Sequence, residues 1–447
     1  MKLLIIDTDS VGLALACWAL YAGHEVKMMS RKRADGSEVS DGKGVPGLEK
    51  VTPEDVFWKR GLLRWADLIV PTGNGYYLDW FEPYRKQGYP IFGPSKASAQ
   101  LEIDRLHGMK MFEHYGLTCP TYIEFPNLDK AIQHVLQNPH PWVFKANGDE
   151  ADKSTSLVTD YPEELIFSLL KWKKKGKRFK EIILQEKIEG IEIGVSRWFG
   201  PAGWIGPYNI NFEHKKLMAG EVGVNTGETG SVLQYVKAEK LGDDVLTPLT
   251  DCLHELGHIG DVDMNCIVAK EGTPYVLEAT CRLGWPAFNI QMACHKGDPL
   301  EWMCSIMAGG NQLEVDYRCA VGVLLAQPEF PYSKGSATHQ EEIPILGFTD
   351  KLVQSRKLSP QEMRKGEVPS IEEDGKLTWN TGWCTAGDYL AIATGLGDGV
   401  EQAKKNAYQV IDKIHYPNKT YRNDIGDKVI KCLPKLHALG YAKGVHI

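Results

Sequence analysis

The pattern of apolar segments changes near Thr118-Cys119-Pro120, and this change limits the folds that the chain can adopt. Before it, the short apolar runs KLLIID and ADLIVPTG are separated by a helical stretch, DSVGLALACWALYAG. Alternating strands and helices predict a parallel sheet covered on both faces. After it, runs such as EIILQEKIEGIEIGVSRWF predict antiparallel strands with one or two helices. We therefore expect an α/β unit followed by an α+β unit.

The length of 447 residues is enough for about three domains. We place the first at residues 1–117, the second at 118–317 and the third at 318–447. The third is predicted from short strands, turns and the helical stretch GDGVEQAKKNAYQVIDKI. No internal repeat or long low-complexity linker interrupts this organisation.

Charge and composition argue against several classes of protein. The formal net charge of −7 is not that of a globally basic nucleic-acid binder. The run KWKKKGKRFK at 171–180 could steer a phosphate backbone, but such runs are more often solvated helix faces. No apolar run approaches the 18 residues of a membrane span, and the N-terminus does not read as a signal peptide. Ten scattered cysteines without a CxxC pair predict free thiols, so we expect a cytoplasmic protein.

A predicted hairpin carries the strongest local signal for chemistry. In DVDMNCIVAKEGTPYVLEATCRLG, Glu278 and Thr280 are two residues apart and share one face of a strand. Asp263 can join them from the paired strand. Magnesium prefers such oxygen ligands and usually shares them with substrate phosphates. The alternative is that an alternating carboxylate merely faces solvent.

Two further segments could contact phosphate or substrate. Lys145 leaves an apolar strand just before Ala-Asn-Gly, where its ammonium group could meet a phosphate. The loop GVNTGETG at 223–230 has glycines that allow backbone amides to approach an anion closely. Each signal is weak alone, because surface lysines and glycine turns are common.

Read in order, these segments resemble an ATP-grasp ligase, and more narrowly the glycinamide ribonucleotide synthetase family (phosphoribosylamine–glycine ligases). The likeness covers nearly the whole chain. VFKANG resembles that family's Val-x-Lys-Ala-Asp/Asn-Gly segment, and HKK…GVNTGETG resembles its His-Lys…Asn-Thr-Gly-Gly-Met-Gly loop. The other matching segments are YPIFGPSKASAQLE, FEHYGLTCPTY, QEKIEGIEIGV, VLEATCRLG and GLGDGVEQAKKNAYQVIDKI…YRNDIG. The resemblance implies an N-terminal pre-ATP-grasp domain, an ATP-grasp domain with a mobile nucleotide-binding part at 118–192, and a small C-terminal domain.

The resemblance also implies a reaction, its cofactors ATP and Mg²⁺, and residue roles. A carboxylate is phosphorylated by ATP, and an amine then displaces phosphate to form an amide. The substrates would be small molecules, an amino acid and an amine. Lys145 and Arg282 are the implied catalytic residues, and Arg282 would face the acyl phosphate or the substrate carboxylate. Residues implied to bind ATP are Arg105, Lys145, Lys153, Gln185, Glu186, Lys187, Ile188 and Glu192. Residues implied to contact substrate are Asp7, Asp9, Asn225, Thr226, Gly227, Arg282 and Asp388, and the implied metal ligands are Asp263, Glu278 and Thr280.

Departures from the family pattern fall where the phosphoribosylamine should bind. The family's Gly-Gly-Arg-Glu-His is Asp7-Thr8-Asp9-Ser10-Val11 here, and its C-terminal Gly-Gly-Arg is Ala386-Gly387-Asp388. Two unit charges about 4 Å apart interact by about 4 kcal/mol at an effective dielectric constant of about 20, so each change from a base to an acid replaces attraction of a phosphate by repulsion. Acids in these places predict weaker binding of a sugar phosphate and favour a cationic or hydroxyl-rich amine. Thr280, where the family has Asn, is a weaker metal ligand.

Our main hypothesis is an ATP- and magnesium-dependent ligase that joins glycine or another small amino acid to an amine other than phosphoribosylamine. A narrower form places that amine on a modified nucleotide or DNA base. The first alternative is a divergent phosphoribosylamine–glycine ligase, with Arg31, Lys32 and Lys96 as candidate phosphate ligands. The second is a nucleotide-binding protein without catalysis. We expect a monomer or homodimer.

Overall fold

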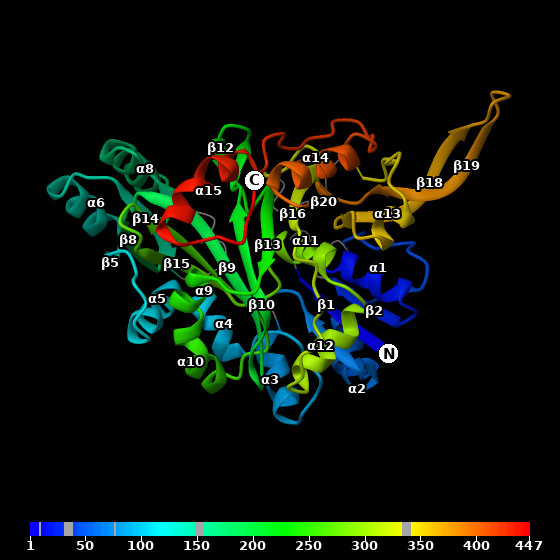
Figure 1. The fold of residues 1–447 in the computed structure, drawn as a ribbon, viewed down its shortest axis with the longest axis horizontal. Helices are drawn as coiled ribbons and strands as arrows, with labels where there is room; N and C mark the ends of the chain where they lie inside the picture. Colours follow the sequence, from blue (N-terminus) through cyan, green and yellow to red (C-terminus); the bar gives the residue numbers. More distant parts are fainter. Residues whose placement is uncertain (9, 31–38, 76, 148–155, 333–340) are drawn as a thin grey trace.

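The computed structural model describes residues 1–8, 10–30, 39–75, 77–147, 156–332 and 341–447. Asp9, Lys153, Arg31 and Lys32, which the sequence singled out, lie outside these residues. Within them, no helix is long and apolar enough to cross a membrane. Figure 1 shows the fold, a mixed α/β architecture that agrees with the expected class.

The N-terminal part is built on a four-stranded parallel sheet of order β3-β2-β1-β4, as the alternating pattern predicted. β1 is apolar from Leu3 to Ile6 because both faces of the sheet are covered. The strands are β1 Lys2–Asp7, β2 Glu25–Ser30, β3 Leu48–Val51 and β4 Leu68–Pro71. The helical elements are α1 Leu13–Tyr21, a π-helical turn Asp55–Lys59, α2 Leu62–Trp65, α3 Leu78–Lys86, α4 Lys96–Ile103 and α5 Arg105–His114.

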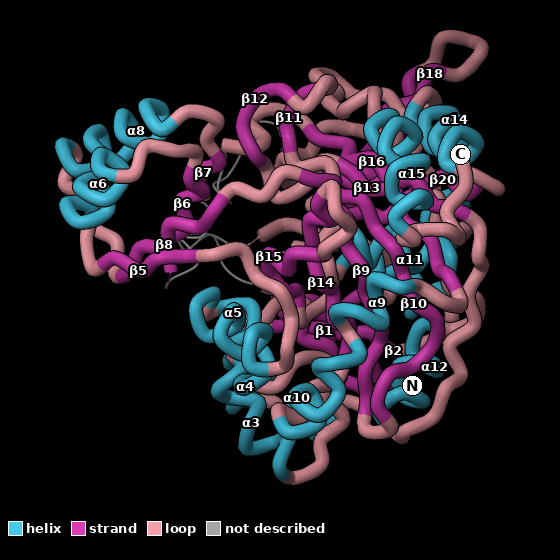
Figure 2. The backbone as a smooth tube through the Cα atoms, turned by 60° about the vertical axis from the view of Figure 1, so that its left-hand side comes forward, coloured by secondary structure: helices cyan, strands magenta, loops and turns pink. Residues whose placement is uncertain are grey.

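A small lobe follows, and it has its own antiparallel sheet of order β5-β8-β6-β7. Its helices cover one face and bury a separate apolar core around Phe144, Leu165 and Ile182. Figure 2 shows this lobe projecting from the rest of the chain. The elements are β5 Tyr122–Phe125, α6 Leu128–Gln137, β6 Trp142–Asn147, β7 Leu157–Val158, α8 Pro162–Lys174 and β8 Glu181–Glu186. The basic run begins in the last turn of α8.

The largest sheet has eight antiparallel strands in the order β15-β14-β9-β10-β13-β16-β20-β17. It continues across residue 317, because β16 pairs with β13 on one side and β20 on the other. The strands are β9 Gly190–Gly200, β10 Gly203–Glu213, β13 Gly230–Val236, β14 Gly260–Ala269, β15 Pro274–Thr280, β16 Cys319–Ala326, β17 Leu358–Pro360 and β20 Tyr389–Gly397. Two-stranded ribbons are formed by β11 Lys216–Met218 with β12 Val222–Asn225, and by β18 Met363–Ile371 with β19 Leu377–Thr385.

Short helices pack around this sheet and link it to the N-terminal part. Helix α1 contacts both α12 and α13, and α14 lies against β16 and β20. A single apolar core therefore includes Leu3 of β1, the central strands and Val445 near the C-terminus. The helices are α9 Lys240–Val245, a 3₁₀ turn Thr247–Leu249, α10 Thr250–Glu255, α11 Ala287–Cys294, α12 Pro299–Met307, α13 Asp350–Gln354, α14 Val400–Ile411 and α15 Asp427–Leu439.

Candidate active site

The predicted hairpin is present, and its register places the three predicted metal ligands on one face. β14 and β15 are antiparallel, with Asp263 opposite Thr280 and Asn265 opposite Glu278. Directly opposite residues share a face, and so do residues two apart. Glu278 and Thr280 are half-buried, whereas the intervening Ala279 points into the core. The alternation of β15 thus presents oxygen-bearing side chains away from the core.

Asp263 is held in place by a side chain from β10, which lies beyond β9 in the sheet. Asn211 of β10 donates from Nδ2 to its Oδ2 at 2.7 Å, across Gly194 of β9. A Cβ at Gly194 would lie 2.2 Å from the Asn211 amide oxygen, so only glycine leaves room for this bond. Burial, followed by the nearby Glu213 and Asp261 carboxylates, raises the pKa of Asp263 well above its usual range. A buried carboxylate among other acids is a place where a cation is favoured.

The donor set fits an oxygen-preferring ion such as Mg²⁺. Asp263 Oδ1 and Asn265 Oδ1 are buried and accept no hydrogen bond, so each has lone pairs to offer. Glu278 lies opposite Asn265. In the part of the chain that the structure describes, no three His, Cys, Asp or Glu side chains form a ready-made metal cluster. The arrangement therefore suits an ion that takes its remaining ligands from phosphate oxygens or water.

Cationic side chains from three segments surround Glu278. Arg105 of α5 lies 3.9 Å from its carboxylate, and so does Lys215, which follows β10. Lys145 of β6 is buried, and its ammonium group donates to the Leu277 carbonyl at 3.4 Å. Burial lowers the pKa of Lys145 to about 8, although Glu278 opposes the shift. The small lobe and the large sheet thus bring positive charge to one place, as binding of a polyphosphate requires.

Lys215 contacts carboxylates from three parts of the large sheet, although the sequence patterns did not indicate it as a site residue. Its ammonium group binds Glu192 at 2.7 Å and Glu213 at 2.9 Å. Burial alone would lower the pKa of Lys215, but these carboxylates and Glu278 raise it well above its usual value. The same ion pair outweighs burial at Glu192 and lowers its pKa. Lys215 lies in the quoted motif HKK, so that motif could have indicated it.

The remaining residues implied to bind ATP lie along the edge of the small lobe. Gln185 is buried in β8 and contacts Met109 through its amide. Lys187 forms an ion pair with Asp160. Glu186, Lys187 and Ile188 lead from β8 toward β9, where Glu192 lies. This stretch connects the lobe to the large sheet.

Arg282 is engaged within the protein. Its guanidinium group binds Glu102 of α4 at 3.2 Å and donates to the Leu283 carbonyl at 3.1 Å. The Glu102 carboxylate also accepts the backbone N–H of Cys281. The structure thus fixes the chain after β15 against α4.

The glycine-rich loop lies against the same region. Thr226 donates its backbone N–H to the Lys215 carbonyl at 2.7 Å, and its hydroxyl donates there at 2.9 Å. A Cβ at Gly227 would lie 2.9 Å from the ring of Trp285, so the loop and this ring are in close contact. Asn225 ends the exposed strand β12, just before these residues. The predicted loop residues therefore lie close to Lys215.

Asp7 and Asp388 belong to a second group of buried acids. Asp7 accepts the N–H groups of Val11 and Gly12 and the Thr72 hydroxyl. Burial and then Asp41 raise the pKa of Asp7. Glu362 accepts the backbone N–H of Asp388 at 2.9 Å, and burial raises its pKa to about 8, with Asp388 and Asp41 adding to the shift. These carboxylates form an electrostatically connected series between the N-terminal sheet and β20.

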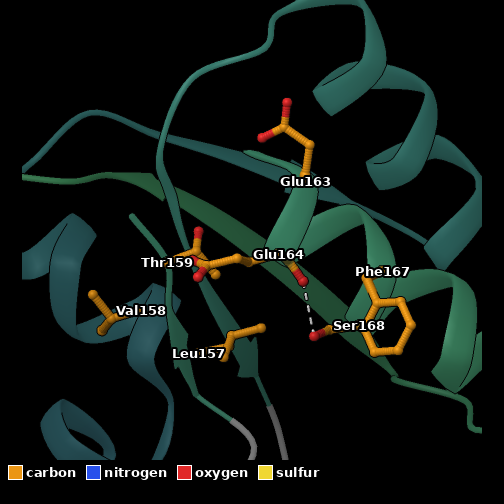
Figure 3. A pocket seen from close by; sticks show the side chains of 7 residues that line it. All are labelled: Leu157, Val158, Thr159, Glu163, Glu164, Phe167 and Ser168. Atoms are coloured by element: carbon orange, nitrogen blue, oxygen red, sulfur yellow. Dashed lines mark hydrogen bonds between the residues drawn. The ribbon is translucent and has the colours of Figure 1, made fainter. Parts of the chain in front are cut away.

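The pocket shown in Figure 3 lies elsewhere. It is an open hollow of about 540 Å³ in the small lobe, between β7 and α8. Its lining residues are Leu157, Val158, Thr159, Glu163, Glu164, Phe167 and Ser168. None of them is a predicted site residue, and the convergent charges described above lie outside it.

Comparisons with known proteins identify relatives of this chain. Residues 104–287 match the family model described as phosphoribosylglycinamide synthetase, ATP-grasp (A) domain. A phosphoribosylamine–glycine ligase of Allochromatium vinosum is 25% identical over 452 residues, covering 96% of this chain and 99% of that protein. The bifunctional purine biosynthetic protein PUR2,5 of Pichia angusta is 26% identical over 393 residues, but the match spans only 46% of its length.

A solved structure extends the likeness to the whole fold. The phosphoribosylamine–glycine ligase of Thermotoga maritima superposes with a TM-score of 0.68 at 20% identity, covering 95% of this chain and 100% of that one. The sequence-based recognition and fold class are thereby confirmed. The chain has the ATP-grasp fold and resembles the phosphoribosylglycinamide synthetase family.

Proposed function

We propose that the protein is an ADP-forming, ATP- and magnesium-dependent carboxylate–amine ligase. The observation that carries this proposal is the convergence of Lys145, Arg105 and Lys215 on Glu278, next to the oxygen donors of β14. These three cations would hold the ATP phosphates and stabilise the charge that moves during transfer. Asp263, Glu278 and Thr280, with Asn265, would hold Mg²⁺, which would neutralise phosphate charge.

The proposed reaction has two balanced steps. An oxygen of the donor carboxylate attacks the γ-phosphorus of ATP, so that an acyl phosphate and ADP form. The nitrogen of a neutral amine then attacks the acyl carbon, phosphate leaves with the bonding electrons, and the nitrogen loses one proton. Catalysis of both steps depends mainly on positioning and charge stabilisation.

Phosphoribosylamine is the first candidate for the amine. The relatives that share about a quarter of their residues with this chain are named as ligases for that amine, and one matches 96% of its length. This likeness supports phosphoribosylamine over the different amine that the sequence departures had suggested. Glycine is the corresponding candidate for the donor.

A second candidate is another amine, either cationic or rich in hydroxyl groups. The buried Asp7 and Asp388 and the half-buried Glu362 favour it, because a phosphate placed beside these acids would be repelled. The two candidates differ in charge and can therefore be separated directly.

The deciding experiment measures ADP release with Mg²⁺, ATP and glycine, with and without phosphoribosylamine generated in situ. Release that depends on phosphoribosylamine, with glycinamide ribonucleotide found by mass spectrometry, would establish the first candidate. Release only with another amine would establish the second. ATP binding with no ADP release across an amine panel would refute the ligase and leave a nucleotide-binding protein.

A further inference from the structure

Glu228 is a buried carboxylate with no role in the reaction as described so far. It lies in the loop between β12 and β13, and only 3% of its surface is exposed. Its carboxylate accepts a hydrogen bond from the Ser231 hydroxyl. Among the described residues, no lysine, arginine or histidine lies within ion-pair distance of it. A buried carboxylate is costly unless a cation or several hydrogen bonds compensate it.

The surroundings of Glu228 increase this cost. Burial raises its pKa well above the usual range, and Glu213 and then Asp263 add to the shift, whereas Lys215 opposes it only in part. Glu213 and Asp263 also border the proposed phosphate-transfer region. Without a bound cation, the Glu228 carboxyl therefore tends to keep its proton at the edge of that region, and a cation that binds beside it would favour the ionised form.

A second polar group is found beside Glu228. The Tyr389 hydroxyl is buried and has no hydrogen-bond partner. After burial, Glu228 and Glu362 are the groups that raise its pKa, so the phenol lies near both carboxylates. The Tyr389 ring packs against Trp285 with 3.7 Å between centroids and a tilt of 34° between the rings, and Trp285 in turn contacts Gly227. The packing that fixes the loop thus also fixes this hydroxyl.

An ammonium group matches this pair of acceptors. It offers three N–H donors and one positive charge, whereas a phosphate or a second carboxylate would be repelled. In an α-amino acid, the ammonium nitrogen is only one carbon away from the carboxylate. An anion that binds this nitrogen must therefore lie beside the phosphate-transfer residues, as Glu228 does.

We propose that Glu228 and the Tyr389 hydroxyl bind the α-ammonium group of the amino acid whose carboxylate is activated. This inference rests on the proposed ligase function and assigns the donor subsite within it. Holding the nitrogen in its protonated form gives a second benefit, because an ammonium group has no lone pair for attack. The donor nitrogen is then not a nucleophile, and the other amine remains the group that attacks the acyl phosphate.

The test compares glycine with glycolate, in which a hydroxyl group replaces the ammonium group. Each is titrated calorimetrically into the full-length protein with Mg²⁺ and a non-hydrolysable ATP analogue. We expect glycine to bind at least about tenfold more tightly than glycolate, because a hydrogen bond to a charged group is worth about 1.5–3 kcal/mol. Glu228→Gln should weaken glycine about tenfold or more and leave glycolate within about twofold. Tyr389→Phe should weaken glycine about threefold.

Controls separate this role from a structural one. Glu239→Gln removes another buried carboxylate, which caps α9 and also bonds the backbone of Ala442, and it should leave glycine binding unchanged. Equal affinity of the wild type for glycine and glycolate would overturn the proposal, as would parallel losses of both in Glu228→Gln.

ADP release measured on the same proteins tests the ligase activity separately from the donor subsite. Binding of glycine that depends on Glu228, with no ADP release from ATP in the presence of any amine tested, would refute the ligase and keep the subsite. Normal ADP release in Glu228→Gln, with an unchanged KM for glycine, would keep the ligase and refute the subsite.

Discussion

At the scale of single residues, the surroundings of two lysines give them different charge behaviour. Lys145 is buried and has a pKa of about 8, because desolvation outweighs its attraction to Glu278. Lys215 has a pKa well above the usual value, because the acids around it outweigh the same penalty. Lys215 therefore behaves as a permanent charge within the protein. The charge of Lys145 is only partly compensated by the acids near it, so a bound phosphate would stabilise it more than it would stabilise Lys215.

Replacing Lys145 tests this difference. Lys145→Gln should weaken ATP binding by about 10- to 100-fold, because one hydrogen bond from a charged donor to phosphate is lost. Lys130→Gln, an exposed change on α6 of the same lobe, should have no effect. The dissociation constant for Mg-ATP, measured by calorimetry, checks both variants. Equal affinities for ATP in Lys145→Gln and the wild type would remove Lys145 from the phosphate site.

The sequence predicted those parts of the site that depend on local spacing, but not the contacts between residues on different strands. The i, i+2 spacing predicted the shared face of Glu278 and Thr280, because that geometry is local to a strand. It could not show that Asn265 stands opposite Glu278, since the β14–β15 register shifts between Asn265 and Cys266. Nor could it show the convergence on Lys215, whose partners lie on three different strands or their ends. Predicted roles for Arg105 and Arg282 stay predictions, although Arg105 lies beside Glu278 and Arg282 follows Thr280 by two residues.

At the scale of elements, His258 joins the N-terminal part to the large sheet. Its ring bonds the Ser98 hydroxyl of α4 at 3.0 Å and the Asp261 carbonyl of β14 at 3.2 Å. Burial lowers the pKa of His258 to about 4, so the ring is neutral in the folded protein. The unfolded chain binds the proton near pH 6.5. The stability contributed by His258 is therefore present above pH 6.5 and is lost as the pH falls toward 4.

This linkage predicts how the effect of His258→Gln depends on pH. Between pH 7 and pH 5, the wild type should lose about 2 kcal/mol that the variant, which has no titrating ring, does not lose. The destabilisation caused by the substitution should shrink by that amount, as measured by urea unfolding at the two pH values. A difference in unfolding free energy that stays constant with pH would show that the ring is not held neutral.

The β18–β19 ribbon projects from the fold (Figure 1), and it has a packed base and an exposed tip. At the base, Trp383 is buried and donates from its indole nitrogen to Asp350 of α13 at 2.8 Å. Toward the tip, Trp379 and Ile371 are 59% and 76% exposed. The contribution of each tryptophan to the free energy of unfolding should therefore depend on its burial, although both belong to the same ribbon.

Alanine substitutions provide a matched pair for this ribbon. Trp383→Ala should cost about 3–5 kcal/mol of unfolding free energy, through a cavity and a lost hydrogen bond. Trp379→Ala should change it by less than about 0.5 kcal/mol, as is usual for an exposed side chain. Chemical denaturation measures both. A large loss for Trp379→Ala would mean that the tip is packed against something in solution.

At the scale of the whole molecule, the small lobe is separate in its packing but shares the site. Its apolar core around Phe144 and Ile182 is distinct from the main core. It nevertheless supplies Lys145, whose ammonium group reaches the Leu277 carbonyl of β15. A nucleotide held by both parts would link the lobe to the large sheet. The alternating and antiparallel patterns predicted both units, but the continuous eight-stranded sheet depends on pairings between distant segments.

Hydrogen exchange can detect this link. Mg-ATP should slow amide exchange in residues 142–147 and 181–188, because a ligand shared with the large sheet opposes opening of the lobe. The exposed tip of the β18–β19 ribbon lies in a different part of the fold and should exchange at the same rate with and without nucleotide. Mass spectrometry of peptic fragments measures both regions. Slowing that is uniform over the chain, or absent from the lobe, would contradict the shared site.

The main core joins residues from opposite ends of the chain, and this has a consequence for synthesis on the ribosome. Leu3 and Ile5 of β1 share their core with Tyr441 and Val445. The first strand therefore emerges on the order of a minute before its last packing partners, at typical translation rates. During that interval the nascent chain carries exposed apolar strands, which chaperones recognise. The small lobe has a local core and can fold while the rest is still being made.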